Sequence, residues 1–114
     1  MSMAWIDDVE RELDRARAAK TAGNDGQVRT SARRAAGYAL TELQRRFPDR
    51  KYGVDFVRQL RGLMEDRGVA EEVRGAAERL QARLSADFAS ASTNPLEDAR
   101  VIIAFVHQEL HRTL

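Results

Sequence analysis

The chain has 114 residues, of which 32% are charged, and it has no cysteine and a net charge of +1. This length fits a single domain, residues 1–114, that can form a core without disulfide bonds. Because acidic and basic residues are mixed, the composition argues against a surface devoted to nucleic acid. The first residues do not resemble a signal peptide, and the longest apolar run, 101–106, is too short to cross a membrane. We therefore expect a cytoplasmic protein without a membrane segment.

Apolar residues recur every three or four positions along the chain, and no alternating strand pattern is present. This period predicts helices over 3–20, 25–47, 54–66, 70–89 and 95–112. The segments between them contain glycine, proline or runs of polar residues, which favour turns. We therefore expect an all-α fold, an up-and-down helical bundle of four long helices plus one short helix, with neighbouring helices antiparallel.

The inner faces of two expected helices differ in side-chain size. The helix over 25–47 has a face of small side chains, formed by Ala32, Ala35, Ala36 and Ala39. Small side chains let another helix approach closely, so we expect a tight contact within the chain, with a subunit interface as the alternative. In the helix over 54–66, the same period places Val57, Leu60 and Leu63 in the core.

Positive charge is concentrated in residues 29–51, which have seven basic and two acidic side chains. We expect an anionic partner to approach this segment first. Within it, Arg34, Tyr38 and Arg45 share the helix face opposite the alanines. Arginines there can hold a phosphate, and the tyrosine can stack on a base. The alternative is that this stripe is the ordinary solvent-facing side of a helix.

The only two histidines, His107 and His111, lie four residues apart and share one face of the last helix. The sequence HQELH is similar to a helical zinc-binding motif, but Gln108 occupies the position of the motif's glutamate. Glu109 lies about 200° around the helix from His107 and cannot act on the same metal-bound water. No third ligand is evident nearby, so we predict neither a metal site nor another cofactor.

Arg100 and His107 are the candidate catalytic residues. They are seven positions apart, so their side chains fall within about 20° of each other on the last helix, away from its apolar side. In a functional interpretation, His107 is a general acid or base on a ribose hydroxyl, and Arg100 holds the phosphate. In the alternative interpretation, both are solvated residues near a helix C-terminus, where the helix dipole favours cations.

Four segments together resemble the HEPN family of small helical domains. They are AWIDDVERELDRARAA near the start, QVRTSARRAAGYALTELQRRF and YGVDFVRQLRGLMED in the middle, and NPLEDARVIIAFVHQEL near the end. The resemblance spans nearly the whole chain and lies in the pattern of apolar and small residues. It implies a helical domain that forms a homodimer.

The resemblance also implies one of two kinds of activity. Some HEPN members are metal-independent ribonucleases, often toxins, in which an arginine and a histidine of the last helix meet across a dimer. Arg100 and His107, with six residues between them, would be that pair, although Val101 replaces the polar residue that usually follows the arginine.

Other HEPN members are non-catalytic modules, some of which pair with nucleotidyltransferase-like proteins. Our leading expectation is a non-catalytic binding or partner module that engages RNA, a nucleotide or a partner protein. A ribonuclease that uses Arg100 and His107, and a structural subunit of a helical assembly, are the alternatives.

Overall fold

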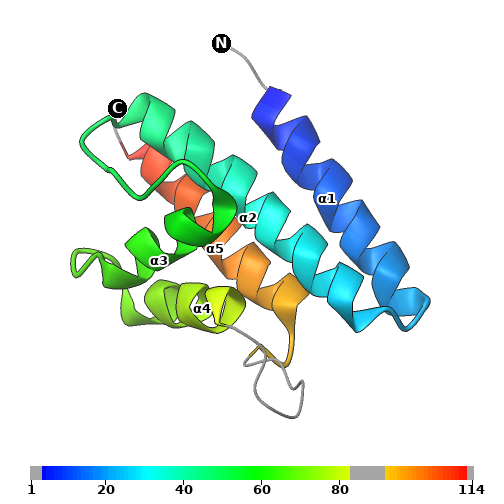
Figure 1. Cartoon of the computed structure of the whole chain (residues 1–114). Helices are drawn as coiled ribbons and strands as arrows, with labels where there is room; N and C mark the ends of the chain where they lie inside the picture. The colour runs from blue at the N-terminus through cyan, green and yellow to red at the C-terminus, as the bar shows by residue number, and fades with distance from the viewer. Residues whose placement is uncertain (1–3, 83–91, 113–114) are drawn as a thin grey trace.

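The computed structural model describes residues 4–82 and 92–112, and every regular element within them is an α-helix. The helices, drawn in Figure 1, are α1 (Ala4–Thr21), α2 (Asp25–Arg46), α3 (Phe56–Glu65), α4 (Glu71–Gln81) and α5 (Pro95–His111). The prediction of an all-α fold is confirmed. Within the described residues, no helix is both long enough and apolar enough to span a membrane.

The helices differ in length from the expected set. α1, α2 and α5 have 18, 22 and 17 residues, whereas α3 and α4 have 10 and 11. α4 ends at Gln81, and Ala82 is extended (ψ 144°), so the helix expected over 70–89 stops earlier than predicted. The rest of that prediction falls mostly in residues 83–91, outside the described residues. The arrangement with four long helices is therefore not confirmed.

The end of α4 is bonded to a side chain of another helix. Arg33 of α2 donates from Nε to the carbonyl oxygen of Leu80 (2.6 Å) and from Nη2 to that of Ala82 (3.0 Å). The last carbonyl groups of a helix have no partners within it and need them from elsewhere. The Arg33 side chain donates to two of these carbonyl groups, which lie 47 and 49 residues further along the chain. No local sequence pattern could indicate this contact.

α2 lies at the centre of the fold, and α1, α3 and α5 pack against it (Figure 1). Trp5, near the start of α1, contacts His107, near the end of α5, so these two helices are antiparallel. Arg50, just after α2, forms an ion pair with Glu109 near the end of α5. The ends of α2 and α5 therefore lie together, and these two helices, which are not consecutive in the chain, run in the same direction.

The alanine face of α2 is buried, as the sequence predicted. Its four members have no exposed surface, and they are Ala32, Ala35, Ala36 and Ala39. They belong to the same core as residues from the other four helices, so a contact within the chain is sufficient to explain the small side chains. The adjacent Gly37 has a separate role in placing α3.

α3 is positioned by two glycines. A Cβ atom on Gly37 would lie 1.9 Å from the ring of Phe56, so only glycine leaves room for this ring on α2. A Cβ on Gly62 of α3 would lie 2.5 Å from the carbonyl oxygen of Tyr52, because α3 runs directly against the backbone of the preceding loop. With Phe56 turned inward, Val57 is 40% exposed, and its predicted place in the core was wrong.

Candidate functional site

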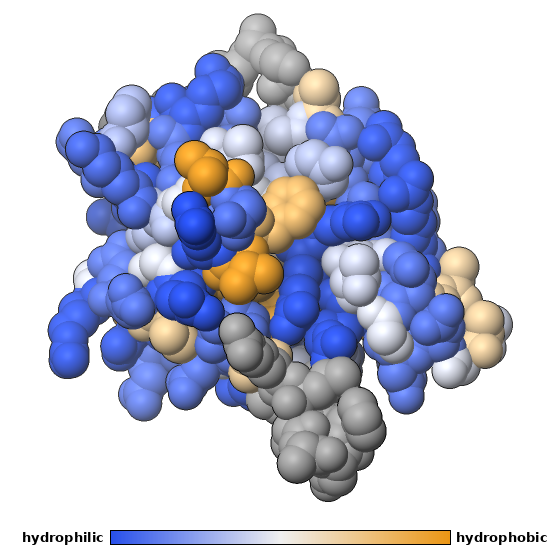
Figure 2. Space-filling model, in the orientation of Figure 1, coloured by the Kyte–Doolittle hydropathy of each residue, from blue (hydrophilic) through white to orange (hydrophobic). Residues whose placement is uncertain are grey.

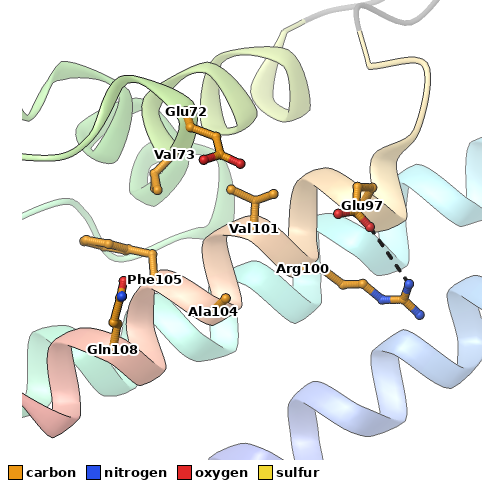
Figure 3. Close-up of a pocket in the computed structure, with 8 residues that line it drawn as sticks. All are labelled: Glu72, Val73, Glu97, Arg100, Val101, Ala104, Phe105 and Gln108. Carbon is orange, nitrogen blue, oxygen red and sulfur yellow. Dashed lines mark ion pairs between the residues drawn. The ribbon is translucent and has the colours of Figure 1, made fainter.

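Arg100 is on the outer side of α5, as the helical period predicted. Its side chain is 47% exposed, and Nη1 lies 4.0 Å from Oε2 of Glu97, one turn earlier. Figure 3 shows the guanidinium projecting from α5 on the side away from Glu72 and Val73 of α4. An exposed pair at this distance holds the side chain only weakly, so Arg100 is free to meet another anion.

His107 is half-buried, because α1 covers one side of its ring. The centroids of the His107 and Trp5 rings are 4.9 Å apart, with an angle of 44° between the ring planes. Nδ1 of His111 donates to the carbonyl oxygen of His107 (2.6 Å), and the two imidazoles are 6.5 Å apart. His107 therefore has a packing role between α1 and α5 that its place on the helix did not reveal.

Arg100 and His107 share a stripe of α5 but have different neighbours. Seven residues correspond to about 10 Å along a helix axis. The described contacts bring Arg100 to Glu97 and His107 to Trp5 and His111, and none joins the two candidate residues to each other. Within one chain, the pair is not arranged around a common point where a phosphate group would react.

A shallow groove lies between α4 and α5 and has a volume of about 380 Å³. Figure 3 shows the eight lining residues, which are Glu72, Val73, Glu97, Arg100, Val101, Ala104, Phe105 and Gln108. The lining combines an apolar floor with side chains of both charges. It contains no serine, threonine, cysteine or histidine, so the groove does not extend the Arg100 stripe into a nucleophilic site.

Most of the basic side chains in residues 29–51 are bonded to other groups of the same chain. Glu42 is buried and accepts bonds from Nη2 of Arg45 (2.7 Å) and Nε of Arg46 (2.9 Å). These bonds, that of Arg45 foremost, outweigh burial and hold the pKa of Glu42 below its usual value. Arg50 is paired with Glu109, and Arg33 caps α4. Four of the seven basic residues therefore have structural partners.

The stripe of Arg34, Tyr38 and Arg45 is not an open binding surface, because α3 packs across its middle. The rings of Tyr38 and Phe56 meet edge to face, with centroids 5.5 Å apart. One turn further, Thr41 accepts a hydrogen bond from Gln59 of α3 (2.8 Å). Arg34 and Arg45 remain exposed on either side of this contact. The three predicted residues are therefore separated, although Tyr38 adjoins the exposed side of α3.

Comparisons of the chain with protein-family models, with curated proteins and with solved structures find no match. The function must therefore be inferred from the contacts of this chain's own residues. Among residues 4–82 and 92–112, no three histidine, cysteine, aspartate or glutamate side chains are grouped so that they could hold a metal ion.

The most unusual surface is one that sequence reasoning missed. Val54 and Val57 are 89% and 40% exposed, and they are the exposed large apolar residues of the described chain. Their neighbours in sequence, Gly53 and Arg58, line a pocket of about 260 Å³. Its lining includes three cations, Lys51, Arg58 and Arg61. We call the two valines and these three cations the α3 patch. Figure 2 shows apolar residues of α3 and the preceding loop near the middle of this face, surrounded by hydrophilic residues.

Proposed function

We propose that this chain is a non-catalytic binding module of HEPN type and that its ligand is a partner protein. The α3 patch is the observation that carries the proposal. Exposed apolar side chains close in sequence to a basic pocket can give a partner protein both apolar and charged contacts. The homodimer and the nucleotidyltransferase-like partner belong to the same proposal, because the family resemblance implies both.

The surroundings of Arg100 and His107 support the non-catalytic part of the proposal. A general acid or base must reach the proton that it transfers, and a phosphate clamp must bind the same group. His107 instead packs on Trp5, which covers one side of its ring, and Arg100 lies beside Glu97. His107 therefore has a packing role that needs no substrate, whereas Arg100 is exposed and only weakly paired.

The contacts of the basic segment favour a protein over RNA or a nucleotide. Affinity for nucleic acid comes mainly from free cations that neutralise phosphates. Arg33, Arg45, Arg46 and Arg50 are bonded to groups of this chain. Base stacking also needs an accessible ring, whereas the edge of Tyr38 packs against Phe56.

The experiment that tests the proposal is incubation of the purified chain with labelled RNA in the presence of EDTA. The proposal expects intact RNA for the wild type. Cleavage that disappears in both Arg100→Ala and His107→Phe would show that the chain is an enzyme. The phenylalanine keeps a ring against Trp5, so loss of activity in that variant could not be attributed to loss of packing.

A further inference from the structure

We infer that the α3 patch binds an acidic, amphipathic segment of a partner protein. This inference rests on the proposed function and specifies the surface and the chemistry of its ligand. The patch combines two exposed valines, Val54 and Val57, with three cations, Lys51, Arg58 and Arg61. A ligand that covers it must offer both apolar side chains and carboxylates.

The apolar part of the patch is a consequence of how α3 is seated. Phe56 occupies the space above Gly37, which turns Val57 outward on the next position of the helix. Val54 is at the exposed part of the loop, three residues before Val57. Phe56, the residue before Val57, is itself only partly buried and packs edge to face on Tyr38. Gly53 and Arg58, which are adjacent in sequence to Val54 and Val57, line the basic pocket, so one ligand segment could cover both parts of the patch.

The charged part of the patch is largely unneutralised. Lys51 and Arg61 form no ion pair with any described residue, and the pair between Arg58 and Asp55 is long (3.4 Å) and exposed. Glu65 is the only acidic residue that lines the basic pocket. A ligand with carboxylates would meet these cations, and the opposite charges would increase both specificity and the rate of association.

The same charges argue against a second copy of the chain at this surface. A two-fold symmetric dimer places the same patch on both sides of the interface. Lys51, Arg58 and Arg61 of one protomer would then lie close to the same cations of its partner. Like charges brought together across an interface oppose association. The occupant expected here is therefore a different, acidic protein segment.

The test is selection of peptides from a displayed random library on the immobilised full chain. Peptides of about 15 residues are long enough to form an amphipathic helix that presents several anchor residues. Binders are counter-selected on the double variant Val57→Asp/Arg61→Glu. Both side chains are exposed, and thermal unfolding checks that the variant remains folded. Lys51→Glu/Arg58→Glu is the second variant if the first does not fold.

We expect the selected peptides to be enriched in glutamate or aspartate together with leucine, isoleucine or phenylalanine. Their dissociation constants should rise at least about tenfold for the double variant. Arg11→Glu is the matched control, because it reverses an exposed arginine on α1, a helix that does not contact α3, and it should leave binding unchanged.

The inference is overturned if the enriched peptides are not acidic or if they bind the double variant as tightly as the wild type. It is also overturned if oligouridine, and no peptide, binds in a manner that the double variant abolishes, because RNA would then be the occupant. An RNA occupant would also contradict the partner-protein part of the proposed function. The non-catalytic part is tested separately, because none of these outcomes measures RNA cleavage.

Discussion

Arg50 joins the end of α2 to the end of α5 through an ion pair with Glu109, 59 residues away. Its guanidinium also lies near the rings of Phe47 and Phe105, 5.6 and 5.9 Å from their centroids. Glu109 is buried and accepts a second bond, from Nη1 of Arg112 (2.8 Å). These contacts fix the part of α5 that presents His107.

Replacing Arg50 with alanine should therefore destabilise the fold. Glu109 would keep only its bond from Arg112, whose side chain is 73% exposed. We expect Arg50→Ala to lower the free energy of unfolding by about 1–3 kcal/mol, as measured with urea. The control, Arg112→Ala, removes an exposed partner and should cost less than about 1 kcal/mol. Equal losses in the two variants would show that Arg50 is not the main partner of Glu109.

The buried carboxylates predict a loss of stability in acid. Burial alone would raise the pKa of Glu109, but the bonds from Arg50 and Arg112 outweigh it, so the pKa is lowered on folding. The pKa of Glu42 is lowered in the same way, chiefly by its bond from Arg45. A lowered pKa stabilises the fold above the unfolded value, about 4.3 for glutamate, and this contribution is lost as pH falls through the folded value.

We therefore expect the free energy of unfolding to change little between about pH 7 and pH 5 and to fall below about pH 4. The variant Glu42→Gln/Glu109→Gln should be less stable near neutral pH and should show a smaller loss in acid. Urea unfolding across this pH range measures both. If the variant lost stability in acid as steeply as the wild type, other carboxylates would be responsible.

Gly37 provides a test of how α3 is seated. A methyl group at this position would overlap the Phe56 ring, so Gly37→Ala should displace α3 and cost about 1–3 kcal/mol. This loss would occur although alanine is about 1 kcal/mol better than glycine within a helix. The control is Gly26→Ala, where the nearest atom would be 3.8 Å away, and we expect it to be neutral or stabilising. A more stable Gly37→Ala variant would contradict the described position of Phe56.

Much of the fold follows from local sequence. The start of α5 is an example: Asn94 accepts a hydrogen bond from the backbone of Glu97 (3.2 Å), and Pro95 is in the first turn, where it loses no helical bond. The buried alanines of α2 and the outward direction of Arg100 also follow from the helical period. These features depend on residues that are close in sequence.

The features that were predicted wrongly or not predicted at all depend on residues that are far apart in the sequence. α4 ends where Arg33 reaches it, and Val57 is exposed because Phe56 needs the space above Gly37. In the candidate site, too, local sequence predicted one feature and missed another that depends on a distant residue. The period placed His107 on the outer side of α5, but its contact with Trp5 requires the packing of α1, which a helical wheel does not contain.

The contact between Trp5 and His107 should contribute to stability. We expect His107→Ala to lower the free energy of unfolding by about 0.5–1.5 kcal/mol, because a ring packed against tryptophan is lost. Trp5 is the only tryptophan, so its fluorescence reports directly on this contact. His107→Phe keeps a ring and should retain most of the stability. If His107→Ala were as stable as the wild type with the same emission spectrum, the two rings would not be in contact in solution.

The most direct test of the non-catalytic assignment is the rate of RNA cleavage with the protein in excess over labelled RNA and with EDTA present. We predict that the wild type leaves the RNA intact and that Arg100→Ala and His107→Phe are indistinguishable from it. A catalytic pair would behave differently, since each residue would act on charge that develops in the transition state. Wild-type cleavage that fell by about 100-fold or more in both variants would contradict the account and establish a metal-independent ribonuclease.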